Sequence, residues 1–172
     1  MNFAAIKRAN EYSPNHIMND FAILKSAADE LVKLGATVNF YDESIIEEGL
    51  IPEPFIFSMV QGAKGIENLR QIERNKAFAI NSADAVYNCY RFNMVPKLHA
   101  AGIPFPESIV INSDSKTLPD LTRFGKKFWV KRGDAHAVHK EDVTLVYSAA
   151  EAANVVHEFS KRGIEKAVLQ EN

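Results

Sequence analysis

The first half of the chain alternates short apolar runs with helical patterns, and this alternation restricts the possible folds more than any other feature. Within residues 17–31, apolar side chains recur at steps of 4, 3, 4 and 3, which places them on one face of a helix: Ile17, Phe21, Leu24, Ala28 and Leu31. Runs typical of strands flank it, at 3–8 and 37–41. Gly35 stands where a left-handed cap would end the helix.

The same alternation continues to residue 80. The run 55–60 predicts a further strand, and Gly62 with Gly65 predicts a turn after it. Helical spacing returns in 66–72, and 78–80 predicts a short strand. Strands that alternate with helices are typical of an open parallel sheet, so the sequence predicts an α/β fold for this half.

The second half follows a different pattern, and we place a domain boundary before Ala83, which gives domains 1–82 and 83–172. A helical segment contains Val86, Cys89 and Tyr90 and runs toward Pro96, which must start a new turn or kink the helix because it has no amide hydrogen. Gly102 ends this segment. The remaining elements are strands and one helix that Ser148 caps; the strands are expected at 109–111, 127–131, 143–147 and 167–170.

Composition excludes several classes of protein. The chain has 172 residues, 20 Lys and Arg against 22 Asp and Glu, and a net charge of −2, which argues against nucleic-acid binding through bulk positive charge. Its single cysteine cannot close an intramolecular disulfide, so a cytoplasmic location is the default expectation. The sequence predicts neither a targeting signal nor a membrane segment.

A basic island interrupts this acidic chain. The segment 123–140 contains six Lys and Arg residues and one acid, Asp134, for a local charge of +5. Such an island suits a phosphate-bearing ligand, but on charge alone an ordinary solvated hairpin is the favoured explanation. Lys131 ends the apolar run Phe128–Val130, so it either extends into solvent or points into a site, and the loop after it could offer backbone N–H groups to phosphates.

Other candidate residues have plainer interpretations. His136 and His139 lack a third ligand at firm spacing, so exposed loop histidines are favoured over a metal site, and we predict no metal ligands in the chain. Cys89 is expected to be a small buried thiol and not a nucleophile, because no partner base can be placed near it. The sequence lacks the glycine-rich dinucleotide and P-loop motifs and the Gly-x-Ser-x-Gly motif of hydrolases.

Four short motifs, in the same order along the chain, resemble the N-terminal part of enzymes of the ATP-grasp superfamily. The resemblance is to the branch of the glutathione-synthetase-like and ribosomal-protein glutamate ligases. The motifs are Asn81-Ser82 with Cys89-Tyr90-Arg91, Gly102-Ile103-Pro104-Phe105-Pro106, Trp129-Val130-Lys131, and Val168-Leu169-Gln170-Glu171. The resemblance implies a small parallel-sheet domain followed by the first α+β lobe of an ATP-grasp domain, with the second lobe missing after residue 172.

The resemblance also assigns candidate nucleotide-binding residues. Arg91 precedes Gly102 by eleven residues, the spacing at which the family usually has a phosphate-binding lysine. Lys131 matches the family's second lysine. Gln170 and Glu171 match the hinge pair whose backbone meets the adenine edge. The loop after Lys131 departs from the family's glycine-rich pattern because Arg132–Val138 holds one glycine.

The implied function is an ATP-dependent ligase that joins a carboxylate to an amine or thiol through an acyl phosphate, with a C–N bond as the expected product. ATP is the expected cofactor, Mg²⁺ is expected only with the missing lobe, and small-molecule or peptide carboxylates and amines are the expected partners. The chain alone is expected to be inactive, and homo-oligomers are possible through the face left by the missing lobe. A non-catalytic nucleotide-binding or partner-binding module is the alternative, and an unrelated two-layer structural domain is a third.

Overall fold

The computed structural model describes residues 1–46, 50–75, 77–134 and 137–172. They form two compact units, Met1–Tyr87 (unit 1) and Asn88–Asn172 (unit 2). The division follows Tyr87, whereas the sequence pattern placed it before Ala83; the short helix α3, Ala83–Asn88, begins at the predicted boundary and contains the observed one. In the described part of the chain, no helix has the length and apolar character needed to span a bilayer.

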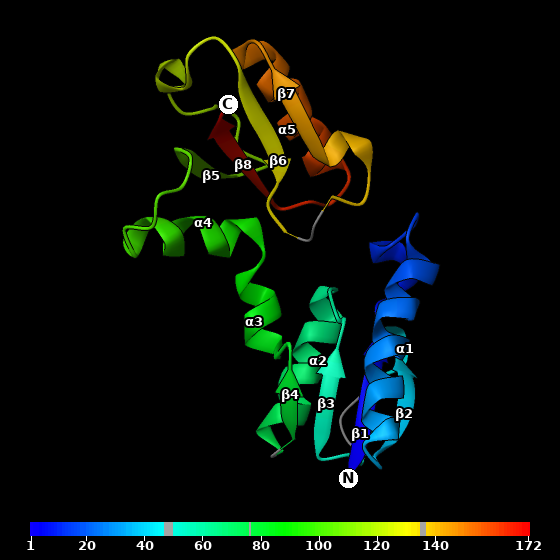
Figure 1. Cartoon of the computed structure of the whole chain (residues 1–172). Helices are drawn as coiled ribbons and strands as arrows, with labels where there is room; N and C mark the ends of the chain where they lie inside the picture. Colours follow the sequence, from blue (N-terminus) through cyan, green and yellow to red (C-terminus); the bar gives the residue numbers. More distant parts are fainter. Residues whose placement is uncertain (47–49, 76, 135–136) are drawn as a thin grey trace. The chain divides into compact units, whose positions relative to one another are not determined.

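Unit 1 is built on a four-stranded parallel sheet, as predicted (Figure 1). Its strands are β1 (Asn2–Lys7), β2 (Thr37–Asp42), β3 (Phe55–Ser58) and β4 (Phe78–Ile80). Their order in space is β2-β1-β3-β4. After β1 the chain therefore adds β2 on one side of β1, and it then adds β3 on the opposite side of β1. Ala4, Ala5, Ile6 and Ile56 from the two central strands are fully buried or nearly so.

Helix α1, Ile17–Lys33, confirms the predicted helix and its cap. Leu24 and Ala28 are buried, and Gly35 has the expected left-handed backbone with φ of +84°. The predicted apolar face is only partly covered, because Ile17 and Phe21 are 41% and 36% exposed. Its amino-terminal turns therefore keep apolar surface available near the ends of the strands.

The predicted turn at Gly62 and Gly65 is wrong. Gly65 lies inside helix α2, Ala63–Arg74, and Gly62 is its N-cap. Neither position has room for a side chain: a Cβ on Gly65 would lie 2.5 Å from Oε1 of the buried Glu43, and one on Gly62 would lie 2.6 Å from Tyr12 Cε2 and 3.0 Å from Glu43 Oε1. Close packing, and not chain reversal, explains these two glycines.

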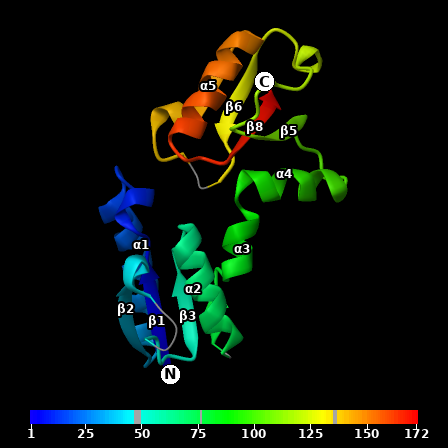
Figure 2. The ribbon, with the colours of Figure 1, turned by 180° about the vertical axis from the view of Figure 1, so that it is seen from behind.

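Unit 2 contains a four-stranded antiparallel sheet in the order β5-β8-β6-β7 (Figures 1 and 2). The strands are β5 (Ser108–Asn112), β6 (Phe128–Arg132), β7 (Val143–Val146) and β8 (Lys166–Glu171). Helix α5, Ala149–Lys161, covers one face. Phe128, Val130 and Leu169 pack there against Val156 and Phe159 as the hydrophobic core. The antiparallel pairing confirms an α+β second unit after the parallel first one.

The helical segment before Gly102 is interrupted earlier than Pro96. Helix α3 ends at Asn88, and α4, Arg91–Ala100, starts after Tyr90, whose φ of −62° and ψ of 131° are extended. Pro96 lies inside α4, where only one backbone hydrogen bond is lost. Cys89 lies at this break and is exposed, so the prediction of a buried thiol is wrong. Short 3₁₀ turns complete the chain: η1 (Asn10–Tyr12), η2 (Glu43–Ile45), η3 (Thr122–Phe124) and η4 (Lys140–Asp142).

Candidate functional site

Lys131 lies on the face of the unit 2 sheet opposite α5. Strand alternation directs Phe128 and Val130 into the core, and Trp129 and Lys131 to the other face. The Lys131 ammonium donates a hydrogen bond to Gln170 Oε1 and lies 5.8 Å from the centre of the Trp129 ring. The side chain is therefore held in a polar and aromatic setting instead of extending freely into solvent.

Gln170 on β8 orients this lysine. It is paired with Trp129 across the sheet, which places it diagonally next to Lys131. Its Nε2 donates to Ser108 Oγ at 3.0 Å, and Ser108 Oγ donates to the Pro106 carbonyl at 2.8 Å. This chain of bonds fixes the Gln170 amide with its oxygen toward Lys131. The sequence analysis did not identify Ser108, and its place at the start of a strand two residues after Pro106 was the available signal.

Arg91 lies near Lys131 from a different element. It is the first residue of α4, and its Nη1 donates to the Arg132 carbonyl at 3.2 Å. The next residue fastens the helix to the same loop, since the Phe92 N–H donates to the Gly133 carbonyl at 2.9 Å. The start of α4 is therefore tied to the end of β6. We refer to Arg91 and Lys131 together as the cation pair.

The charge of Arg91 affects Lys131. Burial lowers the pKa of Lys131, and the positive charge of Arg91 lowers this pKa further. Burial and the charge of Arg132 lower the pKa of Arg91, and the carboxylates of Asp134 and Asp142 partly offset this effect. In the described residues, no carboxylate lies within ion-pair distance of Lys131. An anion bound here would relieve the repulsion between these cations.

Glu171 is engaged elsewhere. Its N–H donates to the Glu107 carbonyl at 2.9 Å, and its Oε1 accepts the Glu107 N–H at 2.8 Å. The side chain is exposed, and its carboxylate is engaged by the Glu107 backbone. Of the four predicted nucleotide-binding residues, the structure therefore brings Arg91, Lys131 and Gln170 together and places Glu171 at the end of β8, so its role at the adenine edge stays a prediction.

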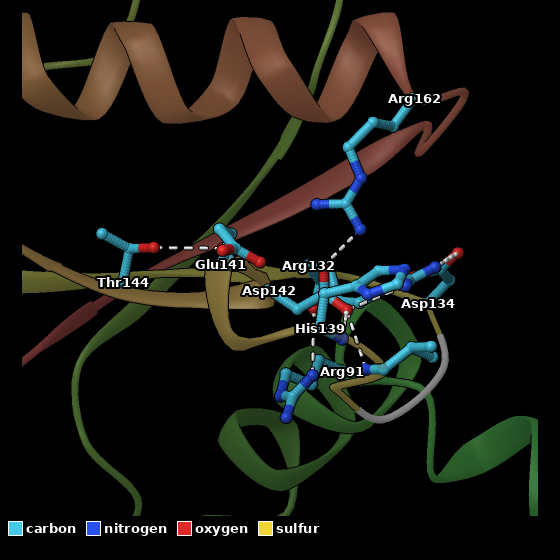
Figure 3. A network of polar contacts seen from close by, with 9 residues as sticks. Arg91, Arg132, Asp134, His139, Glu141, Asp142, Thr144 and Arg162 are labelled. Atoms are coloured by element: carbon cyan, nitrogen blue, oxygen red, sulfur yellow. Dashed lines mark hydrogen bonds and ion pairs between the residues drawn. The ribbon is translucent and has the colours of Figure 1, made fainter. Parts of the chain in front are cut away.

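A second charged cluster, the Asp142 network, lies close by (Figure 3). Asp142 is fully buried, and its Oδ2 accepts the backbone N–H groups of Val138 at 2.7 Å and His139 at 2.9 Å. It also forms ion pairs with Arg132 at 3.1 Å and Arg162 at 2.6 Å. The network joins η4 to the ends of β6 and α5.

The Asp142 network is electrostatically satisfied. Burial alone would raise the pKa of Asp142, but the two backbone N–H donors and the two arginines outweigh it and hold this pKa at about 2. Arg132 also forms a two-point ion pair with Asp134, at 2.6 and 2.9 Å. Burial opposes the charge of Arg132, but these carboxylates raise its pKa overall.

Gly133, in the loop after Lys131, lies where the backbone of this loop packs closely against the backbone of β8 at Lys166. The Gly133 N–H donates to the Lys166 carbonyl at 2.7 Å, and a Cβ on Gly133 would lie 2.8 Å from that oxygen. Gly133 therefore fits because it has no side chain, and it anchors the start of the loop to the strand β8.

The basic island does not form one uniform patch. Arg132 belongs to the Asp142 network, and Arg123 pairs with Glu107 at 3.1 Å. Lys126 and Lys127 are exposed, which leaves Lys131 as the lysine that lies beside Arg91. His136 lies outside the described residues, and among those described no group of three or more His, Cys, Asp or Glu side chains could hold a metal ion.

Neither a protein-family model nor a curated protein sequence matches this chain. Solved structures do match along its whole length. The D-alanine–D-alanine ligase of Bacillus anthracis superposes with a TM-score of 0.75 at 14% identity, and the chain covers 57% of that protein. The D-cycloserine synthetase DcsG gives 0.69 at 17% identity with 59% covered. A RimK domain ATP-grasp protein of Sphaerobacter thermophilus gives 0.65 at 14% identity with 64% covered.

These similarities establish the fold. The chain spans 57–64% of the length of these structures, and its fold is that of the part it covers, a parallel-sheet domain followed by an antiparallel α+β lobe. The expected strand beside Lys131 is present, because β8 pairs with β6 along Phe128–Arg132. An unrelated fold with chance motif matches is therefore excluded.

Proposed function

We propose that this chain is the N-terminal part of an ATP-dependent ligase and that its cation pair binds the phosphates of ATP. The observation that carries the proposal is the placement of Arg91 beside Lys131, with the lysine oriented by Gln170 and without a carboxylate of its own among the described residues. One of the structurally similar proteins, the D-alanine–D-alanine ligase of Bacillus anthracis, was solved as a complex with ATP.

The residues of the site fit a polyphosphate. Lys131 contributes a compact ammonium and Arg91 a planar guanidinium, and the two differ in how they contact phosphate oxygens. ATP supplies a transferable phosphoryl group that converts a carboxylate into an acyl phosphate, from which an amine or thiol displaces phosphate. The cation pair would hold the phosphates and offset their charge. We assign no magnesium ligand to this chain and expect Mg²⁺ to bind with a further lobe.

The proposal is tested by ATP affinity. Lys131→Ala removes one charge-assisted contact and should weaken ATP binding by roughly 1.5 to 3 kcal/mol, measured by calorimetry or equilibrium dialysis. Lys126→Ala is the matched control, because Lys126 is exposed in the same basic segment. ATP affinity unchanged by Lys131→Ala, or lowered equally by Lys126→Ala, would remove the cation pair from a nucleotide site.

The alternative is a module that binds a nucleotide or a partner without turnover. The backbone constraint at Gly133 favours it, because this constraint fixes one end of the loop that would have to cover the phosphates. The ligase proposal and the nucleotide-binding form of the alternative both predict ATP binding, whereas a partner-binding module does not, and all of them predict that the 172 residues alone release no phosphate from ATP. An activity assay of the chain joined to any continuation of its reading frame distinguishes these proposals. Only the ligase proposal then predicts carboxylate-dependent release of phosphate from ATP.

A further inference from the structure

The hydrogen bonds behind Lys131 form a chain in which every group donates in the same direction. Lys131 donates to Gln170 Oε1, and Gln170 Nε2 donates to Ser108 Oγ at 3.0 Å. Ser108 Oγ in turn donates to the Pro106 carbonyl at 2.8 Å. The two ends have fixed roles, because an ammonium group can only donate and a carbonyl oxygen can only accept. The hydroxyl and the amide between these ends, which we call the polar relay, can each do both, so the ends set their orientation.

Ser108 decides which end of the Gln170 amide faces Lys131. A glutamine amide has nearly the same shape in its two orientations, so shape alone does not select one of them. The proton of the Ser108 hydroxyl is donated to the Pro106 carbonyl, and Ser108 Oγ therefore accepts from Gln170. The amide must then direct its NH₂ group at Ser108 and its oxygen at Lys131. In the reversed orientation, two oxygens would face each other at Ser108, and the NH₂ group would face the ammonium.

The polar relay lies in a buried part of unit 2. Ser108 is 8% exposed and Gln170 is 7% exposed, so a hydrogen bond lost here is costly to replace with water. The two residues are paired in register between β5 and β8. Beside them, Glu107 and Glu171 exchange the two hydrogen bonds described above. The backbone thus holds the relay in place whether or not a ligand is bound.

The polar relay orders a side chain that is otherwise flexible. A lysine carries its charge on a four-carbon stem, and ordering that stem when a ligand binds costs conformational entropy. The bond to Gln170 and the Trp129 ring, with its centre 5.8 Å away, restrict the ammonium beforehand, which lowers this cost. Because the amide is neutral, it holds the ammonium without compensating its charge, as a carboxylate in the same place would.

We propose that Ser108 is a positioning residue of the cation pair. It acts through Gln170 and holds the Lys131 ammonium in place for an anion, without contacting that anion. The inference rests on the proposed function, because it requires that Lys131 contacts a phosphate. It goes beyond that function by making the affinity of the site depend on a buried hydroxyl that is separated from the charge by one side chain.

The test compares two variants of the same shape at position 108. Ser108→Thr keeps the hydroxyl and Ser108→Val replaces it with a methyl group, and both side chains suit a strand. The probe is inorganic tripolyphosphate, which has no base or sugar, and calorimetry measures its affinity. Ser108→Thr should bind it like the unmodified chain, and Ser108→Val should bind it about three- to tenfold more weakly, as expected for the loss of one hydrogen bond. Equal affinities of the two variants would overturn the inference.

A double-mutant cycle tests whether Ser108 acts through Lys131. In a chain that carries Lys131→Met, Ser108→Val should cause no further loss of affinity, because the group that it positions is absent. Losses that add would show that Ser108 acts by another route and would contradict the inference. Ser113→Ala is the control, since Ser113 is a buried serine directly after β5 whose Oγ has no hydrogen-bond partner among the described residues. An equal loss in this control would also contradict it.

A structural readout accompanies the affinities. In the isotope-labelled chain, the Gln170 side-chain NH₂ should exchange its protons with water slowly in the unmodified chain and in Ser108→Thr, and faster in Ser108→Val. Gln170→Met replaces the other member of the relay and covers the case in which Ser108→Val fails to fold. It should lower the affinity for tripolyphosphate by a similar factor, and full affinity in Gln170→Met would overturn the inference.

Failure of this inference differs from failure of the proposed function. If Lys131→Ala leaves the affinities for ATP and tripolyphosphate unchanged, the cation pair is not a phosphate site, and both proposals fall. If Lys131→Ala weakens binding while Ser108→Val and Gln170→Met do not, the phosphate site stands and only the positioning role of Ser108 is wrong.

Discussion

Unit 2 contains two groups of cations that differ in how their charge is compensated. In the Asp142 network, Arg132 and Arg162 surround a buried carboxylate that also accepts two backbone N–H groups. In the cation pair, Lys131 contacts the neutral Gln170 and repels Arg91. Compensated charges inside a protein hold its structure together, whereas a partly buried lysine without a carboxylate beside it among the described residues, such as Lys131, is a candidate for binding an anionic ligand. The basic segment of the sequence thus contributes Arg132 to a structural cluster and Lys131 to a candidate functional one.

The largest effect expected from this comparison is on stability. Asp142→Ala leaves Arg162 without its buried partner and removes one partner of Arg132, so we expect a loss of about 3 to 5 kcal/mol in the free energy of unfolding. Urea denaturation followed by circular dichroism measures it. Asp114→Ala, at an exposed aspartate of the same unit, is the control. Equal stability of the two variants would contradict a structural role for the network.

The next effect is on acid stability. The folded pKa of Asp142, about 2, lies below its ordinary value of 3.8, so its contribution is present above pH 3.8 and is lost as the pH falls through about 2. The shift corresponds to about 2 kcal/mol. Unfolding free energies measured between pH 5 and pH 2 should fall more steeply in the unmodified chain than in Asp142→Asn. Parallel pH profiles would show that Asp142 is not the group responsible.

The smallest effect is expected at the cation pair. Lys131→Met keeps the packing against Trp129 and removes a charge that is partly buried beside Arg91, so stability should stay within about 0.5 kcal/mol of the unmodified chain or rise. The same denaturation experiment measures it. A loss of stability comparable to that of Asp142→Ala would abolish the distinction between the two clusters.

The sequence predicted local structure well where periodicity carries the information. The helical face of α1 and the strand alternation at Trp129 and Lys131 are local patterns, and both are confirmed. The break in the helix at Cys89 was not predicted, because Pro96 is the stronger local signal, yet burial of Tyr90 and the bond from Phe92 to Gly133 decide where α4 starts.

Contacts between distant residues account for what the sequence could not predict. The Asp142 network joins residues 132, 142 and 162, and no spacing pattern links them. Ser108 and Gln170 are 62 residues apart and meet only because β5 pairs with β8. Gly65 was interpreted as part of a turn because the residue it packs against in space, Glu43, is far from it in the sequence. Lys131 and Arg91 were assigned from motif order, and the structure adds their proximity.

The most direct test of the cation pair as a phosphate site is the pKa of Lys131, measured by NMR of its labelled side chain with and without ATP. In the free chain, burial and the charge of Arg91 should hold this pKa below the ordinary value of a lysine side chain. Bound phosphate should raise it. A pKa of Lys131 that is ordinary in the free chain and unchanged by saturating ATP would contradict the account.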